Sequence, residues 1–79
     1  MNIKILGPGC VNCEKLEQQT VNALAELGVA ADVVKVTDLN KIMEYDVMTT
    51  PGLVINDTVK VFGRVPRPQE IKKWIQEEL

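Results

Sequence analysis

The chain has 79 residues, of which 46% are hydrophobic and 25% are charged, with a formal net charge of −2 at pH 7. We expect one domain, residues 1–79, because a chain this short buries only roughly 60% of its unfolded surface and cannot support two cores. The two signs of charge are interspersed, which argues against nucleic acid as a partner, since phosphate binding needs a clustered basic surface. No apolar run approaches the roughly 20 residues of a membrane span, so we expect no membrane association. We also expect a monomer.

Cysteine content bears on the compartment. The chain has two cysteines, whereas a secreted mini-protein held by disulfides usually has about four or more. The N-terminal stretch Met1 to Leu6 does not resemble a signal peptide, because it is short and is interrupted by Lys4. We therefore expect a cytoplasmic protein whose cysteines are kept for chemistry.

The first half of the chain predicts a strand, a long helix and a second strand. Asn2 to Leu6 is rich in apolar residues and is followed by Gly7-Pro8-Gly9, which predicts a short strand and a turn. From Cys10 to about Leu27 apolar residues recur at helical spacing, and Gly28 is well placed to end that helix. Valines between Asp32 and Val36 predict a second strand.

The second half predicts a short helix, a hairpin and a last helix. Thr37-Asp38 offers an N-cap for a helix that must end before Thr50-Pro51. Leu53 to Asn56 and Val59 to Phe62 flank a tight turn, which predicts a hairpin, and Pro68 suits the first turn of the last helix. The apolar side chains expected in the core from this half are Leu39, Ile42, Met43, Phe62, Ile71, Trp74, Ile75 and Leu79.

These elements together predict an α/β fold in the order β-α-β-α-β-β-α. A strand, a crossover helix and another strand imply a parallel pair with a right-handed connection. The closing hairpin adds antiparallel strands. The predicted architecture is a four-stranded mixed sheet flanked by three helices.

The motif that carries chemistry is a pair of cysteines, Cys10 and Cys13, at the junction between a loop and a helix. The first turn of a helix has unpaired N–H groups and the positive end of the helix dipole, which lower the pKa of a thiol there. Cys10, at the tip, is predicted to attack a substrate disulfide. Cys13, one turn deeper, is predicted to resolve the mixed disulfide. The pattern indicates a thiol–disulfide oxidoreductase that needs no cofactor.

Two other interpretations of this spacing stay open. A zinc site needs four ligands, and because the chain has no His, a closed site would need two acids or a second subunit. We therefore expect no metal. The pair can also be a purely structural or chance feature. Its place in a strand–loop–helix pattern favours the redox interpretation.

The order of motifs resembles the thioredoxin/glutaredoxin superfamily, and more closely the small thioredoxin-like redox-active disulfide proteins of bacteria and archaea. The resemblance rests on Gly9-Cys10-Val11-Asn12-Cys13 after the first strand, on Val47 to Ile55 leading into the third strand, and on Gly63-Arg64-Val65-Pro66 after the fourth. It covers nearly the whole chain, from Asn2 to Leu79. It implies a minimal thioredoxin fold.

The resemblance also implies a substrate site. In that family the proline matching Pro51 is cis and packs beside the active-site cysteines, and the residue before it, here Thr50, offers backbone hydrogen bonds to an extended substrate segment. The implied partners are client proteins with disulfides and an upstream reductase similar to thioredoxin reductase. A glutathione-coupled glutaredoxin is one alternative. A non-catalytic thioredoxin-fold module that holds metal or senses oxidation is the other.

The chain departs from thioredoxins proper around the motif. Gly9 and Val11-Asn12 stand where Trp and Gly-Pro are usual, and the first strand lacks the buried acid that assists proton transfer. Its only ionisable residue is Lys4, which we expect to be solvated. Glu14 is a candidate for the proton-transfer group.

Four further side chains lie near these motifs. Met43 and Met48 are candidates for a soft surface near the active site, and Met48, shortly before Pro51, is the better candidate for substrate contact, because methionine adapts to varied surfaces. Arg64 and Arg67 follow the fourth strand, and we expect them to be solvated surface residues. On that interpretation the chain has no convincing charged clamp for glutathione.

Overall fold

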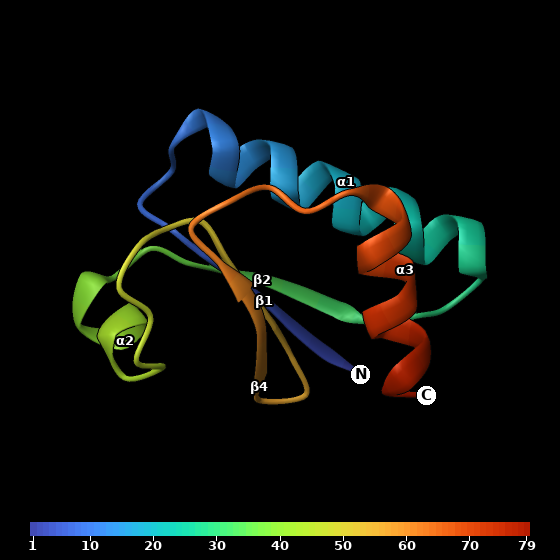
Figure 1. The fold of residues 1–79 in the computed structure, drawn as a ribbon. Helices are drawn as coiled ribbons and strands as arrows, with labels where there is room; N and C mark the ends of the chain where they lie inside the picture. Colours follow the sequence, from blue (N-terminus) through green and yellow to red (C-terminus); the bar gives the residue numbers. More distant parts are fainter.

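Four strands and three helices alternate in the predicted order in a computed structural model that describes all residues, 1–79. The elements are β1 (Asn2–Leu6), α1 (Val11–Leu27), β2 (Asp32–Val36), α2 (Leu39–Met43), β3 (Gly52–Ile55), β4 (Thr58–Phe62) and α3 (Pro68–Glu77). The predicted α/β class, element order and minimal thioredoxin fold are confirmed (Figure 1). No helix combines the length and apolar character needed to cross a bilayer.

The sheet has the strand order β2-β1-β3-β4 and is mixed, as predicted. β1 runs parallel to β2 and antiparallel to β3, and β3 pairs antiparallel with β4 through a register shift between Leu53 and Val54. The register places Leu6, the last residue of β1, opposite Gly52, the first residue of β3. The loop after β1 and the segment before β3 therefore meet at one edge of the sheet.

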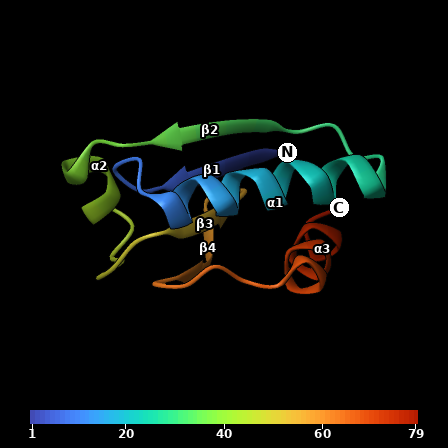
Figure 2. The same ribbon diagram turned by 90° about the horizontal axis from the view of Figure 1, so that it is seen from above.

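Two apolar clusters lie in the core. The larger cluster consists of side chains from β1, β3, α1 and α3: Ile3, Ile5, Leu16, Ala23, Leu24, Leu53, Ile55, Ile71 and Ile75. The smaller cluster brings α2 and the segment after it against the strands: Leu6, Ile42, Val47 and Val54. Because residues alternate across a strand, Ile5 and Leu6 belong to different clusters. Figures 1 and 2 show α2 at the end of the molecule where α1 begins, away from α3.

Local sequence signals account for where elements begin and end. Gly28 ends α1 with a left-handed φ of 66°, and the Asp38 side chain accepts a hydrogen bond of 2.8 Å from the Asn40 N–H at the start of α2. Asn56 and Asp57 have φ values of 49° and 65°. Both residues tolerate this left-handed conformation, so the hairpin closes without glycine.

Several predicted boundaries move by one residue. Cys10 is the N-cap of α1, and the helix itself begins at Val11. β3 spans Gly52–Ile55 instead of Leu53 to Asn56, and β4 begins at Thr58 instead of Val59. The left-handed Asn56 leaves the strand because its backbone belongs to the turn.

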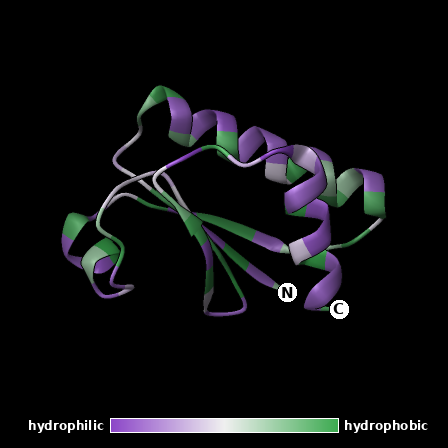
Figure 3. Cartoon of the chain, in the orientation of Figure 1, coloured by the Kyte–Doolittle hydropathy of each residue, from purple (hydrophilic) through white to green (hydrophobic).

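The expected burial is wrong for four apolar side chains. Ile42, Ile71 and Ile75 are buried as predicted, and Trp74 is partly buried against the larger cluster. The exposed ones are Leu39, Met43, Phe62 and Leu79. A five-residue helix presents few side chains to the sheet, and in α2 only Ile42 is buried. Leu39 and Met43 therefore remain exposed on α2, and Figure 3 shows hydrophobic residues in this helix.

Candidate active site

The cysteine pair lies at the N-terminus of α1. Cys10 is the N-cap, with extended backbone angles, and Cys13 lies in the first turn. The two residues form a disulfide, and their Cα atoms are 5.0 Å apart, within the usual range for such a bond. Cys13 is only 5% exposed, whereas Cys10 is half-buried. Of the two sulfurs, that of Cys10 belongs to the more accessible residue.

The helix terminus acts electrostatically on Cys10. The Cys13 N–H donates a hydrogen bond of 3.1 Å to the Cys10 Sγ, so this sulfur takes the place of an N-cap oxygen. The 17-residue helix also directs the positive end of its dipole toward this position. In the reduced protein both effects favour a thiolate at Cys10 over a thiol.

Gly7 makes room for the buried sulfur. A Cβ built on Gly7 would overlap the Sγ of Cys13 and lie 3.1 Å from its Cβ, and it would also lie 3.8 Å from the Cβ of Thr50. The backbone at Gly7 therefore touches both the active-site helix and the segment before β3. The sequence prediction missed this residue, although a glycine directly after a strand signals a close approach.

Thr50 borders Gly7 together with Cys13, and Pro51 follows Thr50 in the chain. Their peptide bond is cis, as the resemblance implies, and Pro51 is buried while Thr50 is half-buried. The Gly63 N–H donates a hydrogen bond of 2.8 Å to the Pro51 carbonyl, which fixes the loop after β4 against the segment. The structure thus brings together four residues from two separate parts of the chain: Cys10, Cys13, Thr50 and Pro51.

Comparison with known proteins agrees with this geometry. A family model described as a thioredoxin domain matches residues 1–76. The chain belongs to the thioredoxin family. A thioredoxin of Methanothermobacter thermautotrophicus is 40% identical over 92% of this chain and 95% of its own length. A thioredoxin of Methanocaldococcus jannaschii is 39% identical over 98% of this chain and 88% of its own length.

Family membership and the disulfide-forming pair identify the activity. The chain is a thiol–disulfide oxidoreductase, and disulfide-bearing proteins are the general kind of partner on which thioredoxins act. Nothing in the comparisons or the site favours a glutaredoxin or a metal-holding module. No group of three or more His, Cys, Asp and Glu side chains is placed to hold a metal ion.

Lys4 does not face the cysteines. Its Nζ donates a hydrogen bond of 2.8 Å to the Tyr45 hydroxyl and lies 3.8 Å from an Asp57 carboxylate oxygen. The hydrogen bond to Tyr45, followed by the charge of Asp57, raises the pKa of Lys4 above its ordinary value. The expectation of a simply solvated lysine is therefore incomplete, because the side chain is paired on the face of the sheet that α2 covers.

A small cavity lies behind Cys13. Its volume of about 20 Å³ is enough for one water molecule, and Glu14, Lys35 and Thr37 line it together with Cys13. Lys35 also pairs with Glu17, at 3.2 Å. Glu14, the sequence candidate for proton transfer, thus borders the same cavity as Cys13. Lys35 was missed because its position depends on the β1–β2 register.

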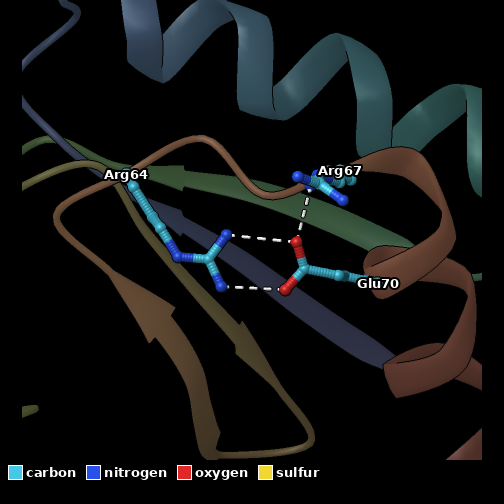
Figure 4. Close-up of polar contacts among 3 residues, drawn as sticks. All are labelled: Arg64, Arg67 and Glu70. Carbon is cyan, nitrogen blue, oxygen red and sulfur yellow. Dashed lines mark hydrogen bonds and ion pairs between the residues drawn. The ribbon is translucent and has the colours of Figure 1, made fainter.

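Arg64 is an exposed residue that forms an ion pair with α3. Two guanidinium nitrogens donate to the Glu70 carboxylate at 3.1 and 2.8 Å, and Glu70 also accepts a hydrogen bond of 3.1 Å from the Arg67 N–H (Figure 4). The Arg64 hydrogen bonds, followed by that from Arg67, lower the pKa of Glu70 to about 2. Arg64 and Arg67 are exposed surface residues, as predicted, and the ion pair of Arg64 ties the loop that contacts Pro51 to α3.

Replacing Glu70 by Gln (Glu70→Gln) is expected to destabilise the fold at neutral pH. The folded protein depresses the pKa of Glu70 from 4.5 to about 2, so the carboxylate stabilises the fold above about pH 4.5 and loses this effect as the pH falls toward 2. Urea unfolding from pH 7 down to pH 3 will measure this. The difference between the two proteins narrows with acidity, and added salt also reduces it.

Glu77→Gln is the matched control, because Glu77 lies exposed on the same helix and forms no ion pair in the structure. This substitution removes the same charge but keeps the two hydrogen bonds between Arg64 and Glu70. A Glu70→Gln protein as stable as the Glu77→Gln protein at pH 7 would contradict the assignment.

Proposed function

We propose that this protein reduces disulfides in client proteins, with Cys10 as the attacking thiolate and Cys13 as the resolving thiol. The proposal treats residues 1–79 as one thioredoxin-like unit. The observation that carries it is the placement of the more accessible Cys10 sulfur at the N-cap of α1, where it accepts the Cys13 N–H. Thr50 and Pro51 are assigned to substrate binding.

The reaction has two exchange steps. The Cys10 thiolate attacks one sulfur of the client disulfide, forming a mixed disulfide and releasing the other client sulfur as a thiolate, which takes up a proton. Cys13 then loses its proton and attacks the Cys10 sulfur. This forms the Cys10–Cys13 disulfide and releases the second client thiolate. The client gains two electrons, and the cysteine pair loses two.

A dithiol donor must then restore the reduced pair. We assign this step to an upstream reductase similar to thioredoxin reductase, and we place the protein in the cytoplasm as a monomer. The names of the two relatives support this assignment. Arg64 also supports it, because its guanidinium is hydrogen-bonded to Glu70 and is therefore not free to bind a glutathione carboxylate.

A coupled assay tests the proposal. Reduction of insulin disulfides is followed as NADPH consumption, once with a flavin thioredoxin reductase and once with glutathione and glutathione reductase. We expect turnover that depends on this protein with the first system and little with the second. Turnover with glutathione alone would transfer the assignment to the glutaredoxin alternative.

A further inference from the structure

Cys13 has to ionise in a place that disfavours charge. The resolving step of the proposed function needs the Cys13 thiolate, because the thiolate is the species that attacks a disulfide. Cys13 is only 5% exposed, and burial disfavours the charged form of a thiol. The N–H of Cys13 donates to the Cys10 sulfur, so this hydrogen bond does not stabilise a charge on Cys13 itself. Another group is needed to offset the charge of the buried sulfur.

The charged side chains nearest to Cys13 come from α1 and β2. On α1 they are Glu14, the next residue, and Glu17, which follows Cys13 by one helical turn on the same side of the helix. On β2 there is Lys35, which lines the small cavity behind Cys13 together with Glu14. Lys35 is the only cationic residue that lines this cavity.

The other elements packed around the pair bring no further charge to Cys13. The loop after β1 and residues 49–55 contain no ionisable side chain. Lys4 on β1 is paired on the opposite face of the sheet, and Arg64 is paired with α3. Lys15 is exposed on the opposite side of α1, because two residues correspond to about 200° of helical rotation. The charge of Lys35 is therefore the favourable one for a thiolate at Cys13.

An ion pair holds the Lys35 ammonium against α1. Lys35 lies opposite Ile5 in the β1–β2 register, on the face of the sheet that α1 covers. Its Nζ lies 3.2 Å from the Glu17 carboxylate, one helical turn from Cys13. The Glu17 carboxylate thus positions the ammonium and also offsets part of its charge. The Lys35 side chain is 54% exposed, so water screens its field and the effect on Cys13 is modest.

We propose that Lys35 stabilises the Cys13 thiolate in the resolving step and that Glu17 limits this stabilisation by pairing with Lys35. The inference rests on the proposed function and adds a positioning pair to it. Cys13 gives its proton to solvent, and its thiolate then attacks the Cys10 sulfur. The new S–S bond forms as the bond to the client sulfur breaks, and the client thiolate leaves. Lys35 keeps its proton throughout and acts only through its charge.

Substitutions of the two paired residues are expected to act in opposite directions. Lys35→Met removes the cation and keeps a long side chain, so we expect the resolving step at neutral pH to slow by about fivefold. Glu17→Gln removes the anion and leaves the ammonium in place, so we expect this step to become about twofold faster. If the ion pair had only a structural role, both substitutions would act in the same direction, since each breaks the same pair.

A pH jump isolates the resolving step. The reduced protein is mixed with an equimolar dipyridyl disulfide at about pH 4, where Cys10 becomes linked to thiopyridine and Cys13 stays protonated. After the jump Cys13 displaces thiopyridone, whose absorbance gives the rate. Rates between about pH 5 and about pH 10 give the midpoint at which Cys13 ionises. We expect this midpoint to rise in Lys35→Met and to fall in Glu17→Gln.

Lys72→Met and Glu26→Gln are matched controls. Lys72 and Glu26 form an ion pair between α3 and α1, and Glu26 lies about 20 Å along the helix from Cys13. We expect both variants to keep the wild-type midpoint. Circular dichroism checks that all four variants fold, and if Lys35→Met does not fold, the midpoint of Glu17→Gln decides alone.

The possible failures are distinguishable. An unchanged midpoint in Lys35→Met or in Glu17→Gln, or shifts of the same sign in both, would overturn the inference and leave the proposed function standing. If the wild-type adduct releases no thiopyridone at any pH, Cys13 does not resolve the mixed disulfide and the proposed function itself fails.

Discussion

Cys10→Ser is expected to abolish disulfide exchange, lowering the rate by at least about a thousandfold, to that of the buffer thiol alone. A serine hydroxyl is not ionised at neutral pH and does not attack sulfur. The variant therefore has no nucleophile at the N-cap of α1, where the geometry favours a Cys10 thiolate in the wild type. Serine is a good N-cap residue, and the fold should therefore be retained. The measurement is insulin reduction by dithiothreitol with each variant present.

Cys13→Ser separates the two roles. This variant keeps the attacking thiol but cannot resolve the mixed disulfide, so we expect a covalent adduct between Cys10 and the client to accumulate. Mass spectrometry of the adduct after digestion identifies the linked cysteine. An adduct formed by the Cys10→Ser protein instead, through Cys13, would reverse the assigned order of attack.

Gly7→Ala is expected to damage both stability and chemistry. The added Cβ would overlap the Sγ of Cys13, with the disulfide already fixing that sulfur in place. Either the loop after β1 or the side chain of Cys13 must move. Overpacking of this kind costs about 1–3 kcal/mol. We expect a matching loss in urea unfolding and a reduction of at least about tenfold in the rate at which the pair closes.

Gly52→Ala is the matched control for this position. Gly52 is also buried at the same edge of the sheet, but a Cβ there meets the flexible end of Leu6 at 3.3 Å, which needs only a small shift. We expect this variant to close its cysteine pair at the wild-type rate. If Gly7→Ala closes the pair equally fast, the backbone contact with Cys13 is not needed for the chemistry.

Much of the fold was predictable because local signals agree with one another. The strand β1, the stop at Gly28 and the hairpin turn at Asn56 each follow from residue type and spacing. The position of Cys10 at a helix terminus followed from the same pattern. Thr50 and Pro51 came from the family resemblance, because spacing alone does not distinguish a cis proline from a trans one.

What was not predictable depends on contacts between distant parts of the chain. Lys4 meets Tyr45 across 41 positions, and Lys35 reaches the cavity of Cys13 only through the sheet register. Helical spacing placed Leu39 and Met43 in the core, because apolar residues are usually buried. In a helix of five residues this spacing predicts burial poorly, and both side chains are exposed.

The pKa of the Cys10 thiol in the reduced protein tests the central claim most directly. The rate of alkylation by iodoacetamide is measured against pH for the Cys13→Ser protein, in which Cys10 is the only thiol. Placement at the N-cap of α1 predicts a pKa below about 7.5, because the helix terminus stabilises the thiolate. A value near the unperturbed pKa of about 8.5 would contradict activation by the helix and with it the assignment of Cys10 as the attacking group.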